Sequence, residues 1–124
     1  MSSARNYSIQ VLREMVFANG MIYQKLNKQF KAQETRLLQR PDQTGALTAE
    51  QQDLNKRVKA VSDDFMATAK RMEELKSLTD DYDEAQQNNE LTLVHWIEDR
   101  VNNEMQQKFQ NLTDKVKELE KIKE

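Results

Sequence analysis

A chain of 124 residues, 37% hydrophobic, 32% charged and only 6% aromatic, is long enough for one domain with a modest core. With two Gly, one Pro and no Cys, the composition favours long helices over sheet. It also excludes disulfides, thiolate zinc sites and a cysteine nucleophile. The formal net charge of −2 does not by itself indicate a partner.

The sequence predicts a single cytoplasmic domain over residues 1–124. The N-terminus lacks the apolar core of a signal peptide. The longest uninterrupted apolar run, Met15–Ala18, is far too short to cross a bilayer. We therefore expect no membrane association.

The first predicted helix covers residues 7–39. Its apolar positions recur at alternating steps of three and four residues, as the buried face of a bundle helix requires. Two polar residues on this face, Asn19 and Gln33, are expected to cost stability and to fix the register. Gly20 in mid-helix predicts a close helix approach or a slight bend. The seam consists of Ile9, Leu12, Val16, Asn19, Tyr23, Leu26, Phe30, Gln33 and Leu37.

Two apolar residues beside Gly20, Phe17 and Met21, lie outside this seam. They form either a small exposed apolar patch or edge packing against the third helix. We favour edge packing, because apolar residues next to a seam commonly widen the buried face.

The second predicted helix covers residues 48–83 and follows a loop over residues 41–47, which Pro41 begins. Thr48 and Gln51 match a capping box. The acidic cluster near its end lacks the Gly and alternating ligands of a calcium loop, so we interpret it as a solvated helix end or an interaction patch; it consists of Asp80, Asp81, Asp83 and Glu84. The seam consists of Leu54, Val58, Val61, Phe65, Thr68, Met72, Leu75, Thr79 and Tyr82.

The third predicted helix covers residues 90–121, after a turn over residues 86–89, with Asn88 or Asn89 as its N-cap. Its central apolar steps are 4, 4 and 4, which suits a bundle better than a regular coiled coil. The seam consists of Leu91, Val94, Ile97, Val101, Met105, Phe109, Leu112, Val116 and Leu119. The three helices predict an all-α, elongated, antiparallel up-down-up bundle with coiled-coil-like seams, as a monomer or weak homodimer.

Charge is divided unevenly among the helices. Residues 1–40 carry seven basic and two acidic residues, whereas residues 41–89 carry six basic and eleven acidic residues. This pattern indicates one of two things. Either the first two helices attract each other, each exposed pair contributing about 0–1 kcal/mol, or the first helix shows a basic face to an acidic partner. We favour the mutual attraction.

No constellation typical of an enzyme, a cofactor site or a metal site occurs in the sequence. The single histidine, His95, has no second histidine or cysteine with which to bind zinc. A Gly-rich phosphate loop and a nucleophile elbow are both missing. Negative charge without a recognised module argues against nucleic-acid binding. We expect a non-catalytic protein without cofactors, in which His95 is a half-exposed structural residue.

Leu93 and Trp96 lie outside the seam of the third helix. Tryptophan is enriched at binding hot spots, which makes Trp96 a candidate partner-binding residue. The alternative is that a wide apolar face near the end of the bundle buries both residues. We favour this alternative slightly.

Two stretches carry a likeness to a known family. In residues 16–37, VFANGMIYQKLNKQFKAQETRL, Tyr23 is followed by a Lys- and Gln-rich continuation. In residues 80–101, an acidic junction leads into Leu93, Val94 and Ile97. Together these stretches resemble the tubulin-binding cofactor A family, small all-helical chaperones of the tubulin-folding pathway.

The resemblance implies a cytoplasmic, cytoskeleton-associated chaperone that captures β-tubulin, alongside other tubulin-folding cofactors, without nucleotide hydrolysis. It implies a partner-binding face with Tyr23, Lys25, Lys28 and Lys31, whose basic character suits tubulin's acidic surface. The alternative function is a structural coiled-coil subunit or adaptor of a larger assembly, such as a kinetochore, tethering or secretion complex.

Overall fold

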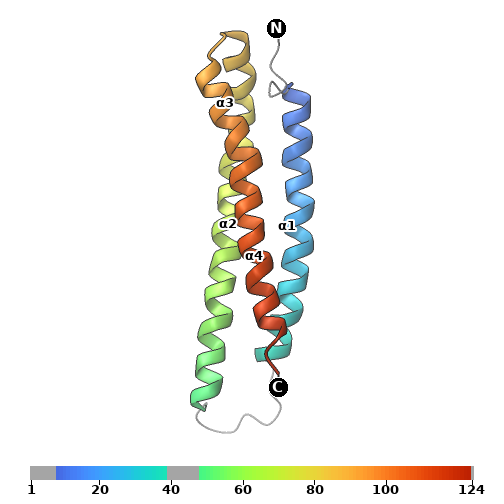
Figure 1. Cartoon of the computed structure of the whole chain (residues 1–124), viewed down its shortest axis with the longest axis vertical. Coiled ribbons are helices and arrows are strands. Elements are labelled where there is room, and N and C mark those ends of the chain that lie inside the picture. Colours follow the sequence, from blue (N-terminus) through green and yellow to red (C-terminus); the bar gives the residue numbers. More distant parts are fainter. Residues whose placement is uncertain (1–7, 39–47, 124) are drawn as a thin grey trace.

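The protein is an all-α helical bundle, as the sequence predicts. A computed structural model describes residues 8–38 and 48–123. The first two arms are α1 (Ile9–Leu38) and α2 (Ala49–Gln87). The third arm is continuous and consists of α3 (Leu91–Asp99), the π-helical segment η1 (Arg100–Glu104) and α4 (Met105–Glu120). Figure 1 shows the arms lying side by side in an elongated bundle.

Contacts between α1 and α2 show that these two helices are antiparallel. The Tyr23 hydroxyl donates to the carbonyl of Phe65 at 3.1 Å. Further along α1, the carbonyl of Leu37 accepts a hydrogen bond from the side-chain amide of Gln51 at 3.5 Å. A later residue of α1 therefore meets an earlier residue of α2.

The third arm runs parallel to α1, which completes the up-down-up arrangement (Figure 1). The Asn19 side-chain amide donates to the carbonyl of Val101 at 3.0 Å. At the other end of α1, the Arg36 guanidinium donates to the carbonyls of Leu119 and Ile122 at 2.8 and 2.7 Å. Arg36 thus binds one carbonyl in the last turn of α4 and one just beyond it, where the helix dipole favours a positive charge.

The predicted seams of α2 and of the third arm form most of the core, whereas in α1 only four seam residues are fully buried and the others are partly buried, the four being Leu12, Leu26, Phe30 and Leu37. In α2 every seam residue is buried except Met72, which is partly buried. In the third arm every seam residue is buried except Leu91, which is 50% exposed. The prediction for Leu91 is wrong because this residue begins α3 at the end of the bundle. The aromatic centre of the core is Phe65, whose ring stacks on Phe30 with centroids 4.9 Å apart.

Local capping signals set the helix starts. The Ser8 hydroxyl accepts from the backbone N–H of Val11 at 3.1 Å, and the Thr48 hydroxyl accepts from that of Gln51 at 3.1 Å. The second bond confirms one half of the predicted capping box. The other half is wrong, because the Gln51 amide donates to Asn55 at 2.9 Å and to α1 instead of returning to the cap.

The turn between α2 and α3 differs from the prediction. The helix α2 continues to Gln87 instead of ending at Asp83. Asn89 adopts a positive φ of 57°, its N–H binds the carbonyl of Gln86, and the N–H of Glu90 binds that of Ala85. This is a Schellman motif, in which a left-handed residue closes the helix. Asn89 therefore ends α2, and Glu90 precedes α3 without a side-chain cap.

The π-helical segment η1 explains the unusual spacing of the third seam. The three four-residue steps from Ile97 to Phe109 span twelve residues, whereas three α-helical turns take about 10.8. A π turn absorbs the surplus of about one residue. Val101 and Met105 consequently both face the core and are 1% exposed.

Asn19 packs against this π segment. A π turn interrupts the regular i→i−4 ladder, and the Asn19 amide binds the Val101 carbonyl there. The second polar seam residue, Gln33, accepts a hydrogen bond from Arg36 at 2.8 Å. Both polar residues therefore have partners, and Asn19 ties the register of α1 to that of the third arm.

Some predicted features fall outside the described residues. These are the predicted ends of the first helix at residues 7 and 39 and the loop over residues 41–47. Over the remaining residues the prediction is confirmed for residues 9–38 and is wrong at Ser8, which precedes the helix.

Candidate functional site

The predicted partner-binding face on α1 divides into one packed residue and three exposed ones. The ring of Tyr23 packs beside that of Phe65, with centroids 5.9 Å apart, and burial raises the pKa of its hydroxyl. Lys25, Lys28 and Lys31 are exposed, and Lys31 pairs with Glu34 of the same helix at 3.3 Å. The face that remains available to a partner is therefore a row of lysines.

The ion pairs between helices do not involve Lys25, Lys28 or Lys31. Within residues 8–38 and 48–123, the interhelical pairs are Arg71–Glu104 and Lys115–Asp64, and both join α2 to the third arm. None joins α1 to α2. The favoured interpretation, attraction between the basic first helix and the acidic second, is therefore not what holds these two helices together.

Trp96 belongs to a different surface. It lies on α3 and is 42% exposed, and the Arg100 guanidinium covers its ring at 5.0 Å from the centroid. Asn19 of α1 lies beside Val101, and the third arm runs parallel to α1. Trp96 therefore lies beside the first part of α1, and Lys28 is roughly 20 Å further along the bundle. The structure thus separates Trp96 from the lysine row.

The favoured burial of Leu93 and Trp96 is wrong. Leu91, Leu93 and Trp96 are all exposed. These side chains lie on the outer side of α3, close to the turn at the end of the bundle, where no further helix among the described residues covers them.

A groove of about 680 Å³ lies between α1 and α2. Its floor includes Leu75 of α2, Val101 of η1 and Met105 of α4, so it opens directly over the core and over the π turn. Three charged residues line it, Arg13 on α1 and both Glu73 and Lys76 on α2. The lining comprises Arg13, Val16, Phe17, Asn19, Gly20, Met21, Gln24, Met72, Glu73, Leu75, Lys76, Thr79, Val101 and Met105.

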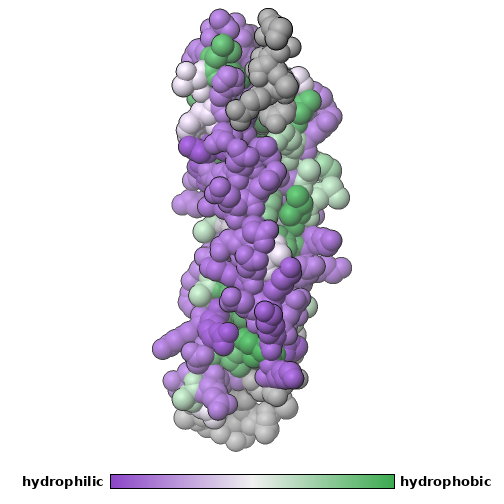
Figure 2. Space-filling model, in the orientation of Figure 1, coloured by the Kyte–Doolittle hydropathy of each residue, from purple (hydrophilic) through white to green (hydrophobic). Residues whose placement is uncertain are grey.

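Phe17 and Met21 form the α1 rim of this groove and are highly exposed. Phe17 is 70% exposed and Met21 is 58% exposed. The favoured prediction of edge packing against the third helix is therefore wrong, and the alternative of an exposed apolar patch is correct. The reason is geometric: both residues lie at the edge of an open groove, and no helix among the described residues covers them. Figure 2 also shows hydrophobic surface along the α1 side of the bundle.

Gly20 also lines this groove, and its backbone is not closely approached. A Cβ atom built at Gly20 meets no heavy atom within 4 Å. The predicted close helix approach is therefore wrong. The missing side chain instead leaves space between Phe17 and Met21, in the wall of the groove.

Gly20→Ala is expected to raise the free energy of unfolding by about 1 kcal/mol. Alanine has the higher helix propensity, and the open space around Gly20 imposes no steric cost. Urea denaturation followed by circular dichroism measures the change. A destabilised variant would contradict the open geometry at this position.

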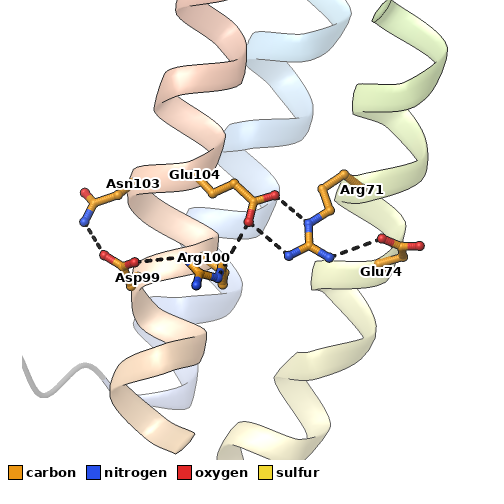
Figure 3. A network of polar contacts seen from close by, with 6 residues as sticks. All are labelled: Arg71, Glu74, Asp99, Arg100, Asn103 and Glu104. Atoms are coloured by element: carbon orange, nitrogen blue, oxygen red, sulfur yellow. Dashed lines mark hydrogen bonds and ion pairs between the residues drawn. The ribbon is translucent and has the colours of Figure 1, made fainter. Parts of the chain in front are cut away.

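A network of charges crosses from α2 to η1 (Figure 3). Arg71 donates to Glu104 through Nε at 2.5 Å and Nη2 at 3.0 Å, and through Nη1 to Glu74 at 3.2 Å. Arg100 extends the network from Glu104 to Asp99. The hydrogen bonds from Arg71 lower the pKa of Glu104, although burial opposes this shift. This bidentate pair fastens the π segment to α2.

The other candidates from the sequence, His95 and the acidic residues near the end of α2, lie on the surface. His95 is exposed on α3. The acidic residues Asp80, Asp81 and Glu84 are exposed on the last turns of α2, and Asp83 is partly exposed. Within the described part of the chain, no group of three or more His, Cys, Asp or Glu residues is placed to hold a metal ion. No helix there has the length and apolar character needed to cross a membrane.

Comparisons with known proteins add no relative. No family model, curated protein or solved structure matches this chain.

Proposed function

We propose that this chain is a cytoplasmic, cytoskeleton-associated, non-catalytic chaperone that captures β-tubulin through the exposed face of α1. One observation carries the proposal: α1 presents Phe17 and Met21 on the same helix as the exposed lysines 25, 28 and 31. Apolar anchors supply affinity, and surrounding charges steer an acidic partner and set specificity. An acidic protein surface such as that of tubulin fits this combination.

The packing within one chain supports a binding protein that works as a monomer. The three arms pack around one common core, although several seam residues of α1 are only partly buried. The outer face of α1 is therefore not needed to hold the bundle together. An apolar residue exposed on such a face costs little stability and remains available for a partner.

Gel filtration with light scattering tests the proposal. We expect the chain to elute as a monomer and to co-elute with free β-tubulin. Reversing the charge of Lys25, Lys28 and Lys31 to glutamate is expected to weaken capture by about tenfold or more, because an acidic surface would then face like charges.

A matched variant controls for net charge. Lys56, Lys59 and Lys70 are exposed lysines of α2, and their reversal to glutamate changes the net charge equally while leaving α1 intact. Capture is expected to survive in this variant. A folded monomer that ignores β-tubulin would refute the proposal, and equal losses in both variants would refute the role of α1.

A second candidate is a structural subunit or adaptor of a larger helical assembly. The exposed apolar residues at the end of α3, Leu91, Leu93 and Trp96, favour it, because they lie away from the α1 face. This candidate predicts self-association or co-purification through α3. Trp96→Ala would then disrupt assembly while leaving any capture of β-tubulin unchanged.

A further inference from the structure

We propose that two copies of this chain pack antiparallel through the outer side of α1, forming a weak dimer that covers the face proposed to capture β-tubulin. The dimer does not depend on the identity of that partner, whereas its effect on capture rests on the proposed function. Three features of α1 carry the inference: an exposed stripe with coiled-coil spacing, an apolar centre of this stripe, and charges placed for an antiparallel copy.

A second stripe of residues, the outer stripe, runs along α1 on the side away from the core. Its members follow alternating steps of three and four residues, which is the spacing of a coiled-coil contact. All of them are exposed, and they lie opposite the buried residues Leu12, Leu26 and Phe30. The other two arms pack on that buried side, so they leave the outer stripe open to a second helix. The outer stripe consists of Val11, Glu14, Ala18, Met21, Lys25 and Lys28.

The centre of the outer stripe is small and apolar. Ala18 and Met21 lie on the stripe itself, and Phe17 and Ile22 flank it on opposite sides. Phe17 is 70% exposed and Ile22 is 44% exposed. The small side chain of Ala18 allows a second helix to come near, and flexible methionine side chains adapt to the shape of the contact.

The charges on the outer stripe match those of a second, antiparallel copy. With the two-fold axis midway between Ala18 and Met21, each Ala18 lies level with the partner's Met21. Glu14 lies four residues before Ala18, and Lys25 lies four residues after Met21. Glu14 is therefore level with the partner's Lys25, and the symmetry forms this ion pair twice.

The same charges disfavour a parallel dimer. In that orientation Glu14 would face the partner's Glu14, and Lys25 would face the partner's Lys25. Both contacts place like charges opposite each other, which is unfavourable. The antiparallel orientation is therefore the one that the outer stripe specifies.

No charge within the described residues competes for this contact. Neither Glu14 nor Lys25 forms an ion pair there. Glu14 accepts a hydrogen bond from the neutral amide of Gln10 at 3.2 Å, and no acidic residue lies three or four positions from Lys25. A second copy supplies the opposite charge to both.

The contact is small, so the dimer is weak. From Val11 to Lys28 the outer stripe is about 25 Å long, and a helix is about 10 Å wide. This footprint is well below the roughly 800 Å² per partner of a standard stable interface. The dilute chain is therefore a monomer, and the dimer forms as the concentration rises.

Dimerisation and capture of β-tubulin use the same face. Met21, Lys25 and Lys28 face the second copy in the dimer, and they also lie on the face proposed for capture. Only one of the two partners can occupy this face at a time. The dimer is thus an inactive form that β-tubulin dissociates.

Sedimentation equilibrium of the full-length chain over about 10 μM to 1 mM tests the dimer. We expect the average mass to rise from that of a monomer towards that of a dimer. Glu14→Lys and Lys25→Glu are each expected to weaken association by about tenfold or more, because each turns two attractive pairs into two repulsive ones. An equimolar mixture of these variants is expected to associate at least as well as the wild type, because both pairs of a mixed dimer are attractive.

Two variants control for net charge and for the other exposed apolar surface. Lys56→Glu changes an exposed lysine of α2 and alters the net charge as Lys25→Glu does. Trp96→Ala removes the exposed ring on α3. Both are expected to dimerise like the wild type.

Disulfide formation reports the orientation, because the chain has no cysteine of its own. Glu14→Cys and Lys25→Cys chains are mixed and oxidised. An antiparallel contact joins one variant to the other, whereas a parallel contact joins each variant to itself. We expect the mixed disulfide to dominate.

A wild-type chain that remains monomeric up to about 1 mM would overturn the inference. So would undiminished association of Glu14→Lys, a mixture of the charge variants that does not associate, disulfides within each cysteine variant, or loss of the dimer in either control. Binding of β-tubulin to the intact dimer would overturn the competition.

Glu14→Lys separates the dimer from the proposed function, because it retains Lys25, Lys28 and Lys31. We expect this variant to lose the dimer and to capture β-tubulin at least as well as the wild type. A wild-type dimer with the expected variant behaviour but without capture would sustain the inference and refute the tubulin partner. Capture by a chain that never dimerises would refute the inference and sustain the proposed function.

Discussion

Phe65→Ala is expected to lower the free energy of unfolding by about 3–5 kcal/mol. The ring is 2% exposed and lies at the junction of α1 and α2, stacked on Phe30 and tilted against Tyr23. Truncation removes the transfer energy of the ring and leaves a cavity that the surrounding helices can fill only in part. The loss is a large fraction of the stability of a domain this small.

Urea denaturation followed by circular dichroism measures this loss, and the neighbouring Met66 provides the control. Met66 is 67% exposed, so Met66→Ala is expected to change stability by less than about 0.5 kcal/mol. A loss below about 1 kcal/mol for Phe65→Ala would mean that this seam faces solvent or a missing partner. Phe65 would then not belong to the packed centre of the bundle.

The second large effect is expected at the ion pair between Arg71 and Glu104. Arg71→Met is expected to destabilise the chain by about 1–3 kcal/mol, because it leaves a partly buried carboxylate without its two shortest hydrogen bonds. Arg100 still lies 3.8 Å from Glu104, which limits the loss. A double-mutant cycle with Glu104→Gln isolates the pairwise contribution.

The exposed pair Lys59–Asp63 serves as the control for this cycle. Its side chains are largely exposed, so Lys59→Met is expected to cost less than about 0.5 kcal/mol. If the Arg71–Glu104 coupling were as small as this, the bidentate pair would contribute no more than a surface ion pair. The attachment of the π segment to α2 would then depend on apolar packing alone.

The pair also predicts a dependence of stability on pH. Hydrogen bonds from Arg71 lower the pKa of Glu104 in the folded chain below its ordinary value of 4.5. The resulting stabilisation is therefore complete above that value and is lost as the pH falls through the lower, folded pKa. Stability measured across this acidic range should fall less steeply for Glu104→Gln than for the wild type. Parallel curves would contradict the shift.

The α1/α2 groove is a feature that the apolar pattern of the sequence did not predict. Phe17 and Met21 are apolar and lie one position away from a seam, which makes burial the natural expectation. Whether such residues are covered depends on the neighbouring helix at that level of the bundle, and no local pattern records this. The same holds for Leu93 and Trp96, whose side of α3 has no facing helix among the described residues.

The exposed lysines of α1 show a second limit of prediction from the sequence. The basic charge of the first helix is evident in the sequence, but charge counts do not identify partners. In the structure, Arg36 binds the end of α4 and Tyr23 binds the backbone of α2, so both are internal contacts. Lys25 and Lys28 remain exposed on the outer face.

The amino-acid sequence by itself determined the three helical arms, their seams and most of their starts. These features depend on apolar spacing and on capping groups a few residues away, which are local interactions. Only the tertiary structure decided that the four-residue steps require a π turn, that Asn19 binds it, and that a groove remains beside Gly20. Each of these depends on how separate helices meet, and therefore on contacts between residues far apart in the chain.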